Sequence, residues 1–135
     1  MKEKFNKIYF WTAGIVTALG ALPLMIMPLK ATKSVLVIDL TSQLDIIPLV
    51  AHWGIMVTGI GIFLCAAAMV QKLRKAAIIY STLEKSYMVS ILIYFMMTNS
   101  KISDHYLLIF VVDSLIVIGA IFYYFLNKEE NKNIT

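Results

Sequence analysis

The sequence is poor in charge and in cysteine. Only 15% of its 135 residues are charged, whereas 60% are hydrophobic, and the mean hydropathy is strongly positive. The single cysteine, Cys65, cannot form an intrachain disulfide and has no second thiol with which to build a metal cluster. This composition lies outside the range of ordinary soluble domains, so we expect a lipid bilayer to be the solvent.

The sequence also lacks the fingerprints of common enzymes. It contains no GxSxG, HExxH, Walker or dinucleotide-binding pattern and no recognisable Ser-His-Asp set. We therefore predict no catalytic residue, no cofactor and no metal site, and a protein that is not an enzyme is favoured. The net charge of +4 comes from cations at the ends of apolar runs, which membrane topology explains without nucleic acid as a partner.

Four long apolar runs account for most of the chain. They cover residues 8–29, 46–70, 76–97 and 105–126, and each reaches the roughly 20 residues needed to cross about 30 Å of hydrocarbon. The first run is too long for the apolar region of a signal peptide. We predict an all-α, integral membrane four-helix bundle with antiparallel up-and-down spans, in a single transmembrane domain over residues 1–135.

The distribution of Lys and Arg predicts the orientation of these spans. Cytoplasmic segments retain positive charge during insertion, and three segments are rich in it, with Lys2, Lys4, Lys7, Lys72, Arg74, Lys75, Lys128 and Lys132. The opposite side has only Lys30, Lys33 and Lys101. Both termini are therefore expected in the cytoplasm.

Two segments lie outside the predicted spans. The external loop 30–45 is too short to span and too apolar for a solvated linker, so we expect it at the mouth of the bundle. Ser42 with Asp45 three residues later predicts a helix N-cap and a capping acid, with the helix beginning near Gln43. The tail 127–135 is polar and is expected to fray.

Small residues recur along one face of the second predicted span, at steps of three and four: Gly54, Thr58, Gly61, Cys65 and Ala68. Such stripes let lipid-embedded helices approach closely, and packing within the bundle is favoured over a homo-oligomer or a contact with a larger complex. Gly14, Ala18 and Ala21 form a weaker counterpart in the first span. The hydroxyl stripe Thr82, Ser86 and Ser90 suits hydrogen bonds between helices, or the wall of a wet cleft.

Ionisable residues inside apolar runs are the sharpest candidates for function. Glu84 and Asp113 each lie about eight residues, or roughly 12 Å, into their spans, which puts both near the midplane of antiparallel neighbours. Charges at this depth are costly unless paired or hydrated, so they mark functional sites by default. Because adjacent residues point about 100° apart, we expect Glu84 and Lys85 not to aim at one spot.

Two interpretations of these residues stay open. A structural one pairs Lys85 with Asp113, and Glu84 is then protonated or bonded to a hydroxyl such as that of Tyr87 or Thr58. A functional one places Glu84, Asp113 and Lys85 at a polar cavity that binds a small polar or cationic ligand or relays protons. His52 and Trp53 would then line its outer mouth. The alternative function is that of a non-catalytic accessory subunit of a larger membrane complex.

One part of the chain resembles a known family. About half of it is similar to the middle of small bacterial membrane proteins of the DoxX-like kind, on the residues His52-Trp53-Gly54, Gly61, Ala66-Ala67, Leu73-Arg74 and Glu84-Lys85. The resemblance implies four helices and a bacterial cytoplasmic (inner) membrane. Association of some relatives with redox complexes implies an accessory role, and the family supplies no catalytic residues to carry over.

Overall fold

The computed structural model describes residues 2–98 and 101–128, and for residues 101–104 it describes the backbone alone. Within this part of the chain there is no strand, and the prediction of an all-α protein is confirmed. The elements are α1 (Lys2–Ile26), α2 (Pro28–Val35), η1 (Leu44–Ile46), α3 (Ile47–Met69), η2 (Gln71–Leu73), α4 (Arg74–Thr98) and α5 (Lys101–Leu126), where η denotes a short 3₁₀ helix.

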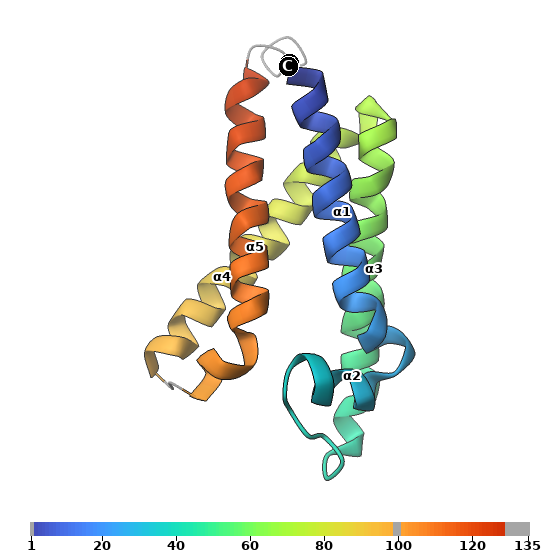
Figure 1. Cartoon of the computed structure of the whole chain (residues 1–135), viewed down its shortest axis with the longest axis vertical. Helices are drawn as coiled ribbons and strands as arrows, with labels where there is room; N and C mark the ends of the chain where they lie inside the picture. The colour runs from blue at the N-terminus through green and yellow to red at the C-terminus, as the bar shows by residue number, and fades with distance from the viewer. Residues whose placement is uncertain (1, 99–100, 129–135) are drawn as a thin grey trace.

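The four long helices run up and down the long axis of the molecule (Figure 1). α1 descends, α3 returns beside it, and α4 and α5 repeat this course as a second pair, so α1 begins and α5 ends at the same end. We call this the terminal end, and the end that carries α2 the loop end. Four segments are long and apolar enough to cross a membrane: Lys2–Ile26, Leu44–Met69, Gln71–Thr98 and His105–Leu126.

The first helix differs from its predicted span. It begins at Lys2 rather than near residue 8, and it ends at Ile26 because Met27 leaves the helical conformation, with φ −137° and ψ 64°. A residue that precedes proline is pushed out of the α region, and Pro28 then opens α2. The predicted external loop 30–45 therefore contains most of a helix, Pro28–Val35, which ends where Val37 adopts the left-handed conformation, with φ 56°.

The predicted N-cap at Ser42 is wrong. Gln43 holds the N-cap position of η1, and no side chain caps either η1 or α3. Ser42 lies one residue too early for its hydroxyl to reach the first free N–H groups, whereas Asp45 does fall in the first turn of η1. Of the predicted tail 127–135, Asn127 and Lys128 are described, and the rest lies outside the described residues.

The closest packing in the molecule joins α1 to α3. A Cβ at Gly54 would lie 2.5 Å from the Met25 nitrogen, and one at Gly61 would lie 2.7 Å from the Ala18 Cβ. At Gly14 it would lie 2.8 Å from the Cys65 nitrogen. Real Cβ atoms do not approach other atoms so closely, so the absence of a side chain at three levels is what lets the two backbones touch.

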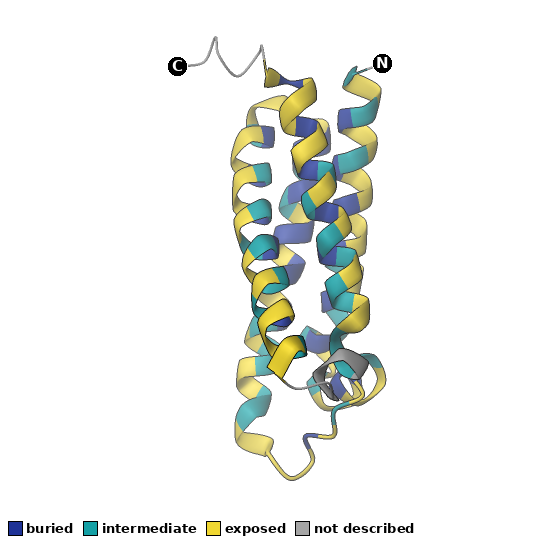
Figure 2. Cartoon of the chain, turned by 90° about the vertical axis from the view of Figure 1, so that its left-hand side faces the viewer, coloured by how far each residue is buried: buried dark blue, intermediate teal, exposed yellow. Residues whose placement is uncertain are grey.

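Buried residues recur along the long helices (Figure 2), and their side chains form two hydrophobic clusters. The larger one, nearer the terminal end, centres on Phe10 and Leu64, both fully buried, and includes Ile116 from α5. The smaller one, at the loop end, joins Leu24, Ala31 and Leu36 to partly buried residues of α3 and α5. The outward faces of the long helices carry most of the exposed apolar side chains, as expected of helices surrounded by lipid.

Candidate functional site

Three ionisable residues meet between α4 and α5. Lys85 Nζ lies 3.1 Å from Asp113 Oδ1 and 3.1 Å from Glu84 Oε2. The side chains of Lys85 and Asp113 are each 5% exposed, whereas that of Glu84 is 26% exposed. The structure therefore brings together all three charged residues that the sequence placed inside apolar runs.

The expectation that Glu84 and Lys85 would not aim at one spot is wrong. Their Cα–Cβ bonds do diverge around the helix, but the four-carbon stem of Lys85 is flexible enough for its ammonium group to lie near both carboxylates. The contact between the Lys85 ammonium group and Glu84 is an ion pair and not a hydrogen bond, since Glu84 Oε2 is buried without a hydrogen-bond partner. Neither hydroxyl predicted as a partner bonds to Glu84 Oε2: Thr58 donates to the Gly54 carbonyl at 2.7 Å, and Tyr87 is exposed.

A cavity of about 290 Å³ adjoins this ion pair. All four long helices and α2 contribute to its wall, through Val16, Thr17, Gly20, Ala21, Leu24, Val35, Trp53, Val57, Lys85, Leu108, Ile109, Val112 and Asp113. Lys85, Asp113 and Thr17 are the polar side chains of a wall that is otherwise apolar, apart from the indole N–H of Trp53. The cavity thus lies where the α1–α3 pair faces the α4–α5 pair.

Thr17, a residue of the cavity wall, carries a hydroxyl that the protein does not satisfy. The residue is only 5% exposed, and its Oγ1 is buried without a hydrogen-bond partner. A buried hydroxyl left unpaired costs about 1–3 kcal/mol, and native structures avoid such groups unless water or a ligand supplies the partner. Ser81 Oγ is a second buried hydroxyl in this state, one helical turn from Lys85 on α4.

The other predicted site residues fall into two groups. Trp53 lines the cavity and packs against the loop-end cluster. His52 is exposed, and neither His52 nor Glu84 is part of the cavity wall. The expectation that His52 lines the mouth therefore needs correction, because α3 turns its neighbour Trp53 toward α1 and α5 instead. Glu84 acts on the cavity only through its charge beside Lys85.

The small-residue stripe lies against α1, and the hydroxyl stripe bonds differently from the prediction. Gly54 and Gly61 meet the α1 backbone, Cys65 contacts Gly14, and Thr58 and Ala68 are buried. Along α4, Ser90 donates to the carbonyl of Ser86, its own helix, at 2.8 Å. Among the described residues no hydrogen bond runs from Thr82, Ser86 or Ser90 to another helix. The hydroxyl of Ser90 is satisfied locally, as is usual for serine within helices.

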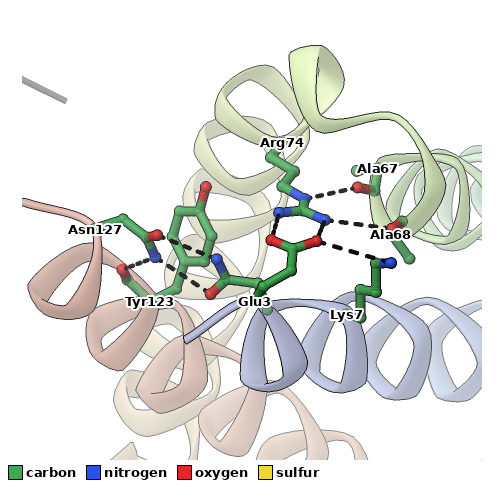
Figure 3. A network of polar contacts seen from close by, with 8 residues as sticks. Glu3, Lys7, Ala67, Ala68, Arg74, Tyr123 and Asn127 are labelled. Carbon is green, nitrogen blue, oxygen red and sulfur yellow. Dashed lines mark hydrogen bonds and ion pairs between the residues drawn. The ribbon is translucent and has the colours of Figure 1, made fainter. Parts of the chain in front are cut away.

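Sequence reasoning missed a polar network at the terminal end, shown in Figure 3. Arg74 is only 6% exposed, and its guanidinium donates to both Glu3 carboxylate oxygens, at 2.7 and 2.8 Å. Its Nε also donates to the carbonyl of Ala67 at 3.1 Å, near the end of α3. Arg74 therefore ties the beginning of α1 to the turn between α3 and α4, and its fork suits this bidentate contact.

A second contact closes the same end. The side-chain amides of Asn6 and Asn127 are buried and donate to each other's oxygens, at 3.1 and 3.2 Å. Asn127 also donates to the Tyr123 carbonyl at 2.7 Å (Figure 3). The sequence does show that polar residues at the ends of two spans can meet if both ends lie on one side of the membrane. It does not show which residues pair when the partners are 121 positions apart.

The described residues contain no group of three or more His, Cys, Asp or Glu side chains that could hold a metal ion. The wall of the cavity carries one cation, Lys85, and one carboxylate, Asp113, while the carboxylate of Glu84 contacts the Lys85 ammonium group without belonging to the wall. No protein-family model matches the chain, and no curated protein or solved structure matches it.

Proposed function

We propose that this chain is a four-span membrane protein that binds a small organic cation with an apolar body in the cavity between its two helix pairs. The observation that carries the proposal is that the Lys85–Asp113 ion pair belongs to the wall of one mainly apolar cavity, to which Thr17, with its unpaired hydroxyl, also belongs. Ligand pockets typically have this character, with apolar walls and a few polar groups that orient the ligand.

The local charge favours a cation. Lys85 supplies one positive charge, whereas Asp113 and Glu84 supply two negative charges within 3.1 Å of its ammonium group. When all three are ionised, one negative charge is left over in a region of low dielectric, where electrostatic attraction is stronger than in water. An ammonium group at Asp113 compensates this charge.

The size of the cavity restricts the ligand. Small-molecule pockets usually enclose roughly 300–1,000 Å³, so a volume of about 290 Å³ suits a compact molecule. Val16, Gly20 and Leu108 are exposed residues of its wall, and they lie on helix faces that are otherwise apolar. We infer that the ligand reaches the cavity sideways between α1 and α5, with its apolar body toward lipid.

The proposal includes the membrane topology. The four long apolar helices support multi-pass membrane insertion, the DoxX-like resemblance favours a bacterial cytoplasmic membrane, and the excess of lysine and arginine at the terminal end favours both termini in the cytoplasm. The DoxX-like resemblance rests on the residues given above and stays a prediction. An accessory-subunit role loses its main argument, because α1 covers the small-residue stripe that suggested a protein partner.

Trp53 offers a direct test. In a Trp11→Phe background it is the only tryptophan, and it lines the cavity. The purified full chain in mild detergent is titrated with cyclohexylmethylamine, with its neutral analogue cyclohexylmethanol and with the anion cyclohexanecarboxylate. We expect a saturable change of Trp53 emission with the amine, a weaker one with the alcohol and none with the carboxylate.

Three variants locate the binding. Thr17→Val removes the unpaired hydroxyl while keeping the shape, so it should weaken amine binding; Glu84→Gln should weaken the amine but not the alcohol, because it removes charge without touching the wall. His52→Gln is the matched control on an exposed neighbour of Trp53 and should change neither. Equal responses to amine and carboxylate, or no saturable change with any of the three, would refute the proposal.

A further inference from the structure

A second hollow lies on the α4–α5 pair, nearer the terminal end than the cavity beside Asp113. It is a groove of about 630 Å³ whose wall comes from the first turns of α4 and the last turns of α5. Ile79, Leu83, Ile121 and Phe125 are large, exposed apolar side chains of this wall. From Lys75 to Leu83 it extends along α4 for roughly 12 Å at 1.5 Å per residue, a shape that suits an extended acyl chain rather than a compact solute.

The groove is charged at one end only. Lys75 belongs to its wall at the terminal end, is exposed, and makes no ion pair with any described carboxylate. Two more exposed lysines, Lys72 in η2 and Lys128 after α5, belong to the same end of the bundle. The nearby Glu3 carboxylate is already held by Arg74. The hydroxyl of Tyr124, on the groove wall, is a further donor.

We propose that this groove is a binding site for one anionic glycerophospholipid, which lays an acyl chain between α4 and α5 and its phosphate on Lys75. The charge complementarity selects the occupant: a zwitterionic lipid fills the same apolar groove but brings its own ammonium group toward the lysines. Basic residues at the cytoplasmic ends of membrane helices recognise anionic headgroups in this manner. The site is separate from the cavity beside Asp113 and does not depend on what that cavity binds.

The test compares two lipids with identical chains. The full-length protein in an uncharged detergent is titrated with dioleoylphosphatidylglycerol or dioleoylphosphatidylcholine, and bound lipid is counted by native mass spectrometry while thermal stability is followed in parallel. We expect selective retention of phosphatidylglycerol. Lys75→Gln should weaken its binding roughly five-fold, the equivalent of about 1 kcal/mol per lysine at a membrane surface.

Two further variants separate headgroup from chain. Lys30→Gln, an exposed lysine at the loop end, is the matched control and should leave both lipids unaffected. Ile121→Trp narrows the groove and should reduce binding of both lipids alike. Equal binding of the two lipids by the parent protein, or identical losses in Lys75→Gln and Lys30→Gln, overturns the proposal. Equal stabilisation by glycerol 3-phosphate also overturns it, because that ligand has the phosphate without the chain.

Discussion

The interface between α1 and α3 and the interface between the two helix pairs are built on opposite principles. The first is closed by glycines at three levels, so that backbone lies against backbone without an intervening side chain. The second meets tightly at the terminal end, through Phe10, Ile116 and Tyr123, and then opens into a cavity beside a buried ion pair. The α1–α3 interface is closely packed, whereas the interface between the two pairs is packed in one part and holds a cavity in another.

The difference shows what each interface can do. Close packing of small residues stabilises helices in lipid, where no hydrophobic effect distinguishes helix from acyl chain. It leaves no room for a ligand. The second interface keeps charged and unpaired polar groups in a region where they are expensive, and such groups persist where they serve binding or hold two segments together.

The largest effect is expected from Lys85→Met. This change leaves Asp113 and Glu84 facing each other without a cation, and breaking a buried pair costs about 3–5 kcal/mol. Asp113→Asn should cost less, because Lys85 keeps Glu84. Unfolding of the purified protein in detergent measures both, and a Lys85→Met protein as stable as Asp113→Asn would show that Lys85 does not hold two carboxylates.

Gly61→Leu attacks the closed interface. Its new side chain must displace the α1 backbone at Ala18, so we expect a loss of about 1–3 kcal/mol from overpacking. Gly59→Leu is the matched control, because a Cβ there meets nothing within 4 Å. Thermal unfolding of the two variants should separate them clearly, and similar midpoints would contradict the close approach of α1 and α3.

Asn127→Leu opens the terminal end of the second interface. It leaves the buried Asn6 amide without its partner, at a cost of about 1–3 kcal/mol. The double variant Asn6→Leu/Asn127→Leu removes both amides and should recover most of this loss, since replacing both partners is nearly neutral. A double variant less stable than the single one would argue against a direct pair.

The smallest effect concerns the loop end. The backbone N–H of Thr41 donates to Asp39 at 3.0 Å, and this bond, together with Lys33, lowers the pKa of Asp39 from its ordinary 3.8 to about 2. A carboxylate whose pKa is lowered in the folded state stabilises the local structure above pH 3.8, and this stabilisation is lost as the pH falls toward 2. Hydrogen exchange at the Thr41 amide should therefore show less protection at pH 2 than at pH 5 once intrinsic rates are corrected, with Asp39→Asn less protected at both.

The sequence allowed the spans to be predicted but not the details of their ends. Four apolar runs of sufficient length have one solution in lipid, because backbone groups must be satisfied within each segment. The break at Met27 follows from Pro28, which hydropathy and charge alone do not reveal, and the missing cap at Ser42 depends on local backbone angles. The Arg74–Glu3 contact joins residues 71 positions apart. The position of Arg74 in a basic segment predicts the orientation of the spans but does not indicate this contact.

Part of the candidate site was predictable for a similar reason. Lys85, Glu84 and Asp113 stand out because charge is rare and costly inside apolar runs. The position of Trp53 near a span end predicts a place at the cavity, and Trp53 does line it. Thr17 could not be found, because a single threonine in an apolar helix normally bonds to its own backbone, and only the packed structure leaves its hydroxyl unpaired.

Four long apolar helices with a few charges inside them follow directly from the sequence, because hydropathy and charge are local properties of the chain. Which helices pair closely and which stand apart depends instead on how the four helices pack together. This packing places the Lys85 ammonium group between two carboxylates and leaves a cavity beside them. The physical reason is that helix pairing in lipid depends on the fit of side chains far apart in sequence, and one hydrophobic pattern is compatible with several such fits.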